Sequence, residues 1–169
     1  MAEYIEFVLI DNHNEERNVK MNADDPNEVY LWRVKSGNRT LKKPYWRRCA
    51  IIDAVGLYSR INITKKSYQL HRVCYYAHNP EWDIYETSCD NSIDHIDRNP
   101  ANNDISNLRA VTHSQNQENT NAKGYSYSNT RKCWVAHLTK DRKQYTKLCN
   151  TEAEAIAARA MLKEKYHTY

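Results

Sequence analysis

The segment from Ser92 to Asn116 constrains the fold of this chain more than any other. Two short apolar pieces, around Ile93 and from Leu108 to Val111, bracket a loop rich in Asn and Asp that has the period of neither a strand nor a helix. This pattern predicts a two-stranded hairpin with a long connection. Thr112 and Gln115 stand at capping-box spacing, so a helix is expected to follow the hairpin directly and to carry Asn116 on its first turns.

The predicted hairpin and helix bring together side chains that suit phosphodiester hydrolysis. Asp94 and Asn116 offer hard oxygen ligands, and we expect them to converge on one divalent cation of the magnesium type. His95 should point to the opposite side of the strand from Asp94, where its imidazole can take a proton from water. An activated water and a cation are what cleavage of a phosphodiester bond requires.

Other interpretations of these residues remain open. His113 competes with Asn116 as the ligand on the helix, and Asn119 and Glu118 are weaker candidates. Arg109 is either a phosphate contact or an ordinary surface residue, and His71 is expected to be an ordinary packed histidine. For the segment as a whole, the competing interpretation is an Asn-rich surface loop with an incidental histidine, because Asn and Asp are common in turns for conformational reasons.

The spacing of these residues resembles the HNH, or ββα-metal, motif of phage and intron homing endonucleases. Asn107 follows Asp94 by thirteen positions and Asn116 follows Asn107 by nine, within Asp-His-Ile-Asp-x-Asn and Asn-Leu-Arg pieces that also match. The resemblance covers about residues 70–121. It implies that Asp94 and Asn116 bind the metal, that His95 is the general base, and that Asn107 ties the loop so that His95 is aimed correctly. The last letter of the motif is Asn116 here, which favours Mg²⁺, with Mn²⁺ as a substitute, over zinc.

The charge distribution predicts a polyanionic partner, for which we take double-stranded DNA. The net charge is only +4, but residues 33–72 hold eleven basic side chains against one acidic side chain, and residues 120–169 hold ten against four. Residues 1–32 are acidic, with eight acidic side chains against two basic ones. Two basic blocks flank a nearly neutral centre, as in proteins that grip nucleic acid, although a solvated basic surface would give the same counts.

The first basic block is expected to be β-rich. Residues 4–10 predict a strand, residues 11–27 turn and loop, and residues 31–63 an antiparallel sheet with one cationic face. A short helix is expected from Leu70 to Ala77, ended by Asn79-Pro80. The phosphate contacts expected in this block are Arg47, Arg48, Arg60, Lys65 and Lys66.

The second basic block predicts three strands, at 125–128, 133–139 and 144–148, and a helix at 151–166. Residues 124–169 resemble an AP2-type DNA-binding domain, through Lys123-Gly124-Tyr125 and the pieces around Trp134 and Asn150, although the arginine-rich first strand of that family is absent. Alternation places Trp134, Ala136 and Leu138 toward the helix, whose apolar face is expected to be Ala153, Ile156, Ala157, Ala160 and Met161. The outer face, expected to lie in a groove of DNA, is formed by Ser126, Ser128, Lys132, His137, Tyr145 and Lys147, with the last four as DNA contacts.

These patterns together predict an α+β protein with three parts. Residues 1–69 form a β-rich DNA-gripping region, residues 70–121 an HNH nuclease domain, and residues 122–169 an AP2-like DNA-binding domain. The predicted function is site-specific DNA cleavage of the homing type, by a monomer or homodimer, and a restriction-type enzyme or a non-catalytic DNA-binding regulator are the alternatives. No apolar run suits a membrane helix or a secretory signal, so a cytoplasmic protein is expected. The resemblance to phage homing endonucleases implies phage origin and action in a host cell.

Overall fold

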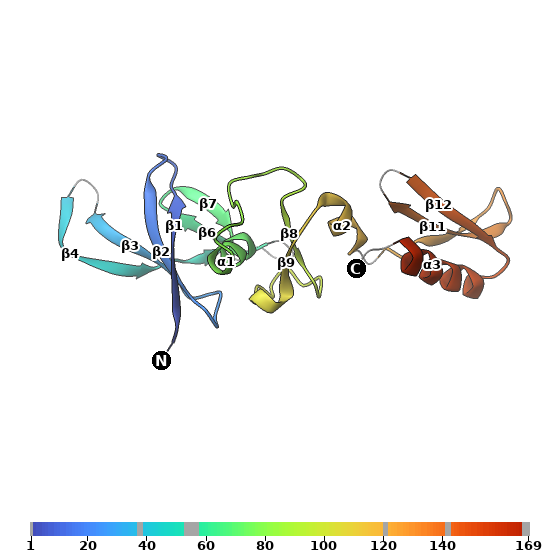
Figure 1. The fold of residues 1–169 in the computed structure, drawn as a ribbon, viewed down its shortest axis with the longest axis horizontal. Coiled ribbons are helices and arrows are strands. Elements are labelled where there is room, and N and C mark those ends of the chain that lie inside the picture. The colour runs from blue at the N-terminus through green and yellow to red at the C-terminus, as the bar shows by residue number, and fades with distance from the viewer. Residues whose placement is uncertain (1, 37–38, 53–57, 120–121, 141–142, 167–169) are drawn as a thin grey trace. The chain divides into compact units, whose positions relative to one another are not determined.

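A computed structural model describes residues 2–36, 39–52, 58–119, 122–140 and 143–166 (Figure 1). The chain divides into two compact units, residues 1–111 and 112–169, which are described separately below. Strands predominate in both units and three helices accompany them, so the predicted α+β class is confirmed. In the described part of the chain, no helix is both long enough and apolar enough to cross a membrane.

A four-stranded antiparallel sheet opens the first unit, with the strand order β1-β2-β3-β4. The strands are β1 (Tyr4–Ile10), β2 (Glu16–Asn22), β3 (Val29–Ser36) and β4 (Arg39–Arg48). The predicted strand at 4–10 is confirmed, whereas the prediction of turn and loop throughout 11–27 is wrong, because β2 lies within it. Only two residues of β2, Val19 and Met21, are apolar and fully buried, and the other residues of the strand are polar. The alternation of apolar and polar residues that predicts a strand is therefore weak in β2.

A second, smaller sheet joins the first sheet to a helix. It consists of β5 (Ile51–Ile52), β6 (Arg60–Ile63) and β7 (Lys66–Gln69), and α1 (Leu70–His78) follows directly, which confirms the predicted helix. One core contains Leu9 and Leu31 from the first sheet, Ile61 from the second and Leu70 from α1. The same core therefore extends across residue 69, where a domain boundary was predicted.

Basic side chains lie on both faces of the first sheet. Leu31 is paired with Arg47 and Tyr30 with Arg48, and consecutive residues of a strand point to opposite faces. Arg47 is therefore on the side of the buried Leu31, and Arg48 is on the outer side with Tyr30. The prediction of a single cationic face is wrong for this sheet.

The first unit ends in the predicted hairpin. Its strands are β8 (Ser92–His95) and β9 (Leu108–Val111), and the short 3-10 helix η1 (Ile105–Asn107) leads into β9. Ile93 and Leu108 belong to the same core as α1, so the hairpin is anchored on that helix. This arrangement fixes the loop between the two strands against the rest of the unit.

The second unit begins with α2 (His113–Glu118) and continues with the sheet of β10 (Tyr125–Ser128), β11 (Cys133–Lys140) and β12 (Lys143–Cys149), which α3 (Glu152–Tyr166) follows. The three strands and the helix occur where the sequence predicts them. Ala136, Cys149, Ala155 and Ala158 form the buried core, with Trp134 packed against it. The predicted orientation of Trp134 and Ala136 toward the helix is thus confirmed.

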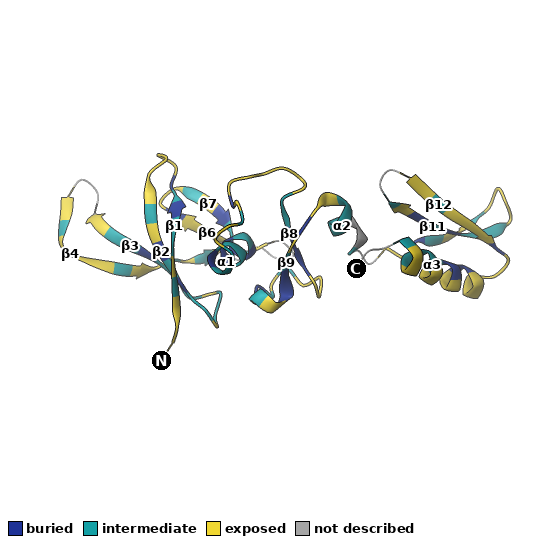
Figure 2. Cartoon of the chain, in the orientation of Figure 1, coloured by how far each residue is buried: buried dark blue, intermediate teal, exposed yellow. Residues whose placement is uncertain are grey.

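Two predicted faces of this unit are wrong. Ile156 and Met161 are 49% and 60% exposed, while Ala155 and Ala158 are buried, so α3 packs through its small residues. Figure 2 shows much of the surface of α3 as exposed. On β12, Leu138 is paired with Tyr145 and Ala136 with Lys147, which puts Tyr145 and Lys147 on the helix side of the sheet. Tyr145 also stacks on Tyr166 of α3, with 3.9 Å between ring centroids.

Candidate active site

Asp94 and His95 stand side by side at the end of β8, and both are buried, at 7% and 4% exposure. Asp94 is paired across the hairpin with Arg109, and His95 with Leu108. Because Leu108 belongs to the core, His95 lies on the side of the hairpin that packs on α1, and Asp94 lies on the other side. The prediction that the two side chains point to opposite sides of the strand is confirmed.

The carboxylate of Asp94 is held by Arg109. Nε and Nη2 of Arg109 donate to Oδ2 of Asp94 at 3.0 and 2.8 Å. The Arg109 side chain is 30% exposed and the Asp94 side chain 8%, so the pair lies at the border between interior and solvent. The two bonds fix the orientation of the Asp94 carboxylate at this border.

The imidazole of His95 is oriented by Asn103, a residue that the sequence did not single out. Nε2 of His95 lies 3.1 Å from Oδ1 of Asn103, and Asn103 is itself 4% exposed. The Asn103 oxygen can only accept a hydrogen bond, so it favours the tautomer of His95 that carries the proton on Nε2. In that tautomer the basic lone pair is on Nδ1. The geometry therefore suits a histidine that accepts a proton through Nδ1.

Two further rings surround His95. Tyr58 stacks on it with 5.7 Å between centroids, and His71 of α1 meets it edge-on at 5.2 Å. Burial, with smaller contributions from His95 and Arg72, lowers the pKa of His71 to about 3, so His71 is neutral at physiological pH. His71 is packed, as predicted, but it is packed directly against the candidate base.

Asn107 ties the loop between the two strands into a fixed shape. Its Oδ1 accepts from the backbone N–H of Asp97 at 3.0 Å, and its Nδ2 donates to the Asp97 carboxylate at 3.0 Å and to the Asn102 carbonyl at 2.8 Å. Its own carbonyl accepts from the N–H of Ile96, directly after His95. Bonds from Asn102, Asn99 and Asn107 lower the pKa of Asp97, so its carboxylate stays charged and continues to accept them.

The connection between α1 and β8 is also held in place by hydrogen bonds. The guanidinium of Arg72 on α1 donates to the carbonyls of Asn91, Ile84 and Glu86 at 2.8 to 3.0 Å. These three residues belong to the connection between α1 and β8, and Arg72 also lies over the ring of Trp82. Arg72 belongs to the basic block of the sequence, but in the structure it holds this connection in place.

The helix residue Asn116 lies on α2, which begins two residues after β9 ends. The predicted capping box is confirmed, because the Thr112 side chain accepts from the N–H of Gln115 and the Gln115 side chain accepts from the N–H of Thr112. α2 belongs to the second unit and Asp94 to the first, so the convergence of Asp94 and Asn116 stays a prediction. His113 is exposed on the same helix, and the Glu118 side chain is outside the described part of the chain.

The donor set fits a magnesium ion better than a zinc ion. Within residues 2–36, 39–52, 58–119, 122–140 and 143–166, no cluster of three or more His, Cys, Asp or Glu side chains could hold a metal ion. A structural zinc site needs about four nitrogen or sulfur ligands from the protein. Magnesium instead needs one or two protein oxygens and completes its shell with water and phosphate, so the carboxylate of Asp94 suits it. The second oxygen, from Asn116 in the other unit, stays a prediction.

The predicted DNA contacts occupy several elements. Arg47 and Arg48 on β4, Arg60 on β6 and Lys65 after it are exposed, whereas Lys66 lies over the rings of Tyr68 and Tyr85. In the second unit, Lys132 is exposed and His137 is on the outer face of the sheet. Tyr145 and Lys147 are on the helix side, so they do not share a face with His137.

Comparison with known proteins finds a family model that is similar to the segment holding this site. The model of the HNH endonuclease family matches residues 68–118, the segment that holds α1, β8, β9 and α2. This match supports an HNH nuclease, and the homing type stays a prediction. No curated protein and no solved structure matches the chain significantly. The AP2-like character of residues 124–169 stays a prediction.

Replacing Asn107 with alanine is expected to destabilise the first unit. The substitution removes three hydrogen bonds of a side chain that is 8% exposed, and buried polar groups left without partners cost about 1–3 kcal/mol. Chemical denaturation should show a loss of about 2 kcal/mol, whereas Asn62→Ala, at an exposed position of β6, should stay within about 0.5 kcal/mol of wild type. Equal stability of the two variants would contradict the structural role of Asn107.

The neutral His71 predicts a pH dependence of stability. Its pKa is near 3 in the folded protein and about 6.5 in an unfolded chain, so the unfolded state binds the proton first as the pH falls. Above about pH 6.5, protonation of His71 does not affect the free energy of unfolding. Between about pH 6.5 and pH 3, the free energy of unfolding falls with falling pH, because only the unfolded state binds the proton. Thermal unfolding at pH 7 and pH 5 should show a smaller loss for His71→Gln than for wild type. An identical loss in the two proteins would count against a buried neutral imidazole.

Proposed function

We propose that this protein is a site-specific, homing-type DNA endonuclease that hydrolyses one phosphodiester bond with a divalent metal ion and His95 as the general base. The observation that carries the proposal is the buried Asp94–His95 pair at the end of β8, with each side chain held by its own partner, Arg109 or Asn103. A cutting centre needs a metal-binding carboxylate and a base that are both held rigidly, and a surface loop lacks such support. The match of this segment to the HNH endonuclease family supports the same conclusion.

The residues have separate roles in the proposed reaction. Asp94 and Asn116 would hold Mg²⁺ or Mn²⁺, and the ion, when bound, supplies charge stabilisation at the scissile phosphate. His95 accepts a proton from the attacking water, with Asn103 fixing its tautomer and His71 staying neutral beside it. Asn107 keeps the loop in the shape that aims His95. Arg109, partly exposed beside Asp94, is placed to contact a phosphate as well.

DNA would be gripped by residues of both units. In the first unit we propose phosphate contacts by Arg47, Arg48, Arg60, Lys65 and Lys66, and in the second unit contacts by the outer sheet face with Lys132 and His137. Tyr145 and Lys147 are left out because they face α3. With one cutting centre in each chain, a monomer nicks one strand, and a double-strand break needs a homodimer or a second encounter.

One observation favours a second function. The Asp94 carboxylate already accepts two bonds from Arg109, as in a structural ion pair. A DNA-binding regulator that keeps the hairpin and helix only as a scaffold would have such a pair at the position of the metal ligand. The regulator would bind the same DNA without cutting it.

Selection from a randomised DNA library separates these functions. The protein is incubated with the library and Mg²⁺, and bound and cleaved molecules are sequenced separately. The proposed endonuclease predicts cleaved ends at a fixed position within an enriched sequence. Enrichment of bound molecules without cleaved ends would instead identify a regulator, and cleavage without sequence preference would refute site specificity.

A further inference from the structure

The hairpin of β3 and β4 extends beyond the sheet to which it belongs. β3 pairs with β2 only through Val29, Tyr30 and Leu31. Beyond Leu31, the recorded pairs of β3 are with β4 alone, from Trp32 with Trp46 to Ser36 with Arg39. We name the two-stranded part formed by residues 32–36 and 39–46 the ribbon. An isolated hairpin is only marginally stable in water, and the ribbon adds little to the hydrophobic core. We therefore look for a binding role for it.

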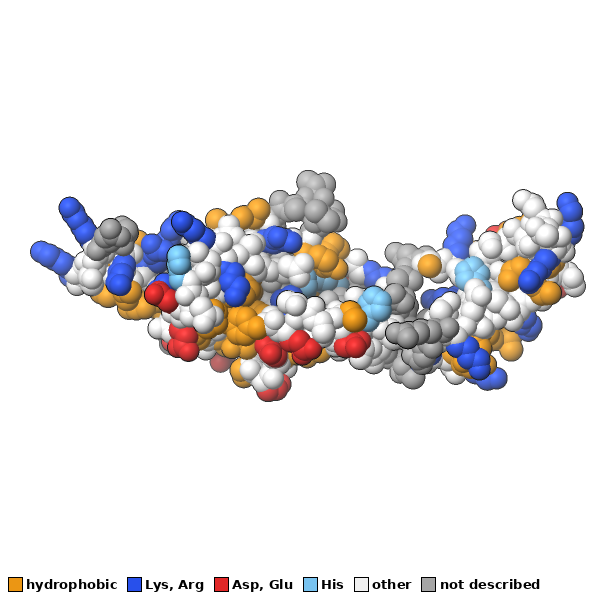
Figure 3. Space-filling model, turned by 90° about the horizontal axis from the view of Figure 1, so that it is seen from above, with side chains coloured by type: hydrophobic (Ala, Val, Ile, Leu, Met, Phe, Trp, Pro, Cys, Tyr) orange, Lys and Arg blue, Asp and Glu red, His pale blue; other side chains and the backbone are white. Residues whose placement is uncertain are grey.

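The ribbon and its base are strongly basic. Residues 29–48 hold seven basic side chains and no acidic one. The charges are near the base of the ribbon (Arg33, Arg47 and Arg48), at the middle of β4 (Lys42 and Lys43), and toward the far end of the ribbon (Lys35 and Arg39). Lys42 and Lys43 lie where the register of β3 and β4 shifts, and both are exposed. Lys and Arg side chains project from this end of the first unit in Figure 3.

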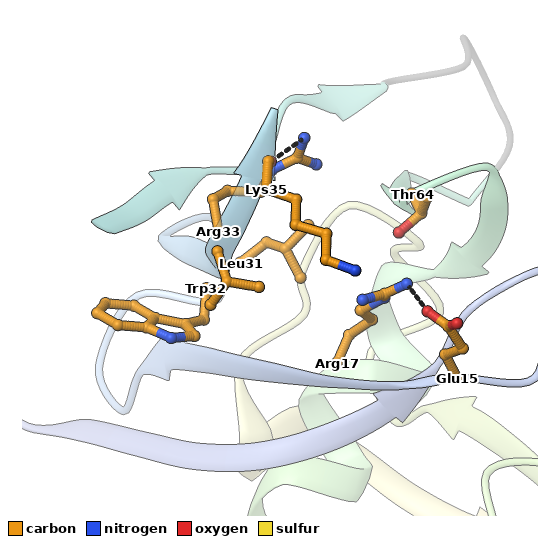
Figure 4. A pocket seen from close by; sticks show the side chains of 8 residues that line it. Glu15, Arg17, Leu31, Trp32, Arg33, Lys35 and Thr64 are labelled. Carbon is orange, nitrogen blue, oxygen red and sulfur yellow. Dashed lines mark hydrogen bonds and ion pairs between the residues drawn. The ribbon is translucent and has the colours of Figure 1, made fainter. Parts of the chain in front are cut away.

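A hollow beside the base of the ribbon adds to this surface. It has a volume of about 270 Å³ and is lined by Arg17, Leu31, Arg33, Lys35 and Thr64, among others. Lys35 reaches over the hollow toward Arg17, while Trp32 points to the other side of the strand (Figure 4). Arg17 is bonded to Asp11 and to Glu15, which also lines the hollow, and Arg33 donates to the carbonyl of Lys35. The hollow therefore offers the ammonium group of Lys35 to a ligand.

We infer that the ribbon enters the major groove of duplex DNA and reads base edges there, an inference that rests on the proposed DNA-cleaving function. The major groove is about 12 Å wide and 8.5 Å deep, and it admits a two-stranded β-ribbon. Five residues of strand extend roughly 17 Å, long enough to span the depth of the groove. An element inside a groove has a phosphate backbone on each side, so cations are useful on both of its faces, as they are on this hairpin. A sheet that lies flat on DNA needs cations on one face only.

Base contacts are assigned to the exposed cations of β4. Arginine and lysine make their commonest specific contact with O6 and N7 of guanine. Arg39, Lys42 and Lys43 are exposed and project from the ribbon, so they are the residues that reach base edges. Arg33, Arg47 and Arg48, nearer the core, contact phosphates, as does Lys35 beside the hollow. The ribbon thereby sets part of the recognition sequence, separately from the cutting centre at β8.

Methylation interference on the selected DNA site tests the groove assignment. Dimethyl sulfate modifies guanine N7 in the major groove and adenine N3 in the minor groove, so one reagent distinguishes the two. Interference by guanine N7 at one flank of the site, lost in Lys42→Gln/Lys43→Gln, is the expected result. The matched control is Lys163→Gln/Lys165→Gln on α3, which removes the same charge and should keep the wild-type pattern.

Binding measurements complete the test. Arg39→Ala should weaken binding to the selected site roughly 10- to 100-fold and relax sequence preference at one position. Arg48→Gln removes a cation assigned to a phosphate, so it should lower the slope of log K against log[salt] by about 0.9. Minor-groove interference at this flank, or ribbon variants with wild-type affinity and pattern, would overturn the inference while cleavage by wild type persists. Failure of wild type to bind DNA would overturn the proposed function itself.

Discussion

His95→Ala should lower the rate of DNA cleavage by about 10²- to 10⁴-fold, the usual contribution of a positioned general base. DNA binding should be unchanged, because the grip is assigned to other residues. Single-turnover cleavage of the selected site measures the rate, and a gel-shift titration measures the affinity. His13→Ala, at an exposed loop position of the same unit, is the control and should cleave like wild type.

The folding of the His95 variant must be checked, because His95 is 4% exposed and packs on Tyr58 and His71. His95→Gln fills more of the space and serves as a second variant. Cooperative thermal unfolding together with retained DNA affinity shows that either variant is folded. Wild-type cleavage rates in a folded His95 variant would remove His95 from the role of base.

Asp94→Asn should abolish most of the cleavage at millimolar Mg²⁺. The change keeps an acceptor for Arg109 but removes the charge that attracts the cation, and a metal ion supplies several kcal/mol of transition-state stabilisation. A rate loss of at least about 10²-fold is expected, with partial recovery at higher Mg²⁺ or Mn²⁺ concentration. Asp24→Asn, an exposed acid in the first unit, should leave the metal requirement unchanged.

A metal titration of the cleavage rate distinguishes two roles of Asp94. If Asp94 is a ligand, the Asn variant needs more Mg²⁺ for half-maximal rate. If Asp94 only pairs with Arg109, the Mg²⁺ concentration for half-maximal rate stays at the wild-type value. That second result would contradict the assignment of Asp94 as a metal ligand.

The hairpin and helix of the candidate site could be predicted because their signals are local. Asn and Asp mark the loop through their own turn chemistry, and Thr112 and Gln115 cap the helix through contacts three residues apart. The partners of His95 could not be predicted in this way. Tyr58 and His71 reach it across the fold, and Asn103 is one of several asparagines in the loop, so only coordinates single it out.

The errors in the predicted faces of the second unit have a common physical cause. Predicted faces were chosen by putting the largest apolar side chains inside, but α3 packs through Ala155 and Ala158 and leaves Ile156 and Met161 exposed. On β12, Leu148 is 56% exposed while Cys149 is buried. Small residues allow the helix and the sheet to approach closely. Close packing therefore decides which face of α3 is buried, even though larger apolar side chains are then left exposed. Strand β2 was missed because most of its residues are polar.

Conversion of a supercoiled plasmid that carries the selected site tests the central claim most directly. Wild-type protein is incubated with the plasmid in Mg²⁺ and in EDTA, alongside His95→Ala. A cutting centre built on Asp94 and His95 predicts nicked or linear product only for wild type and only with Mg²⁺. Intact plasmid under every condition, with the site fully bound, would contradict a nuclease, and so would equal cutting by wild type and His95→Ala.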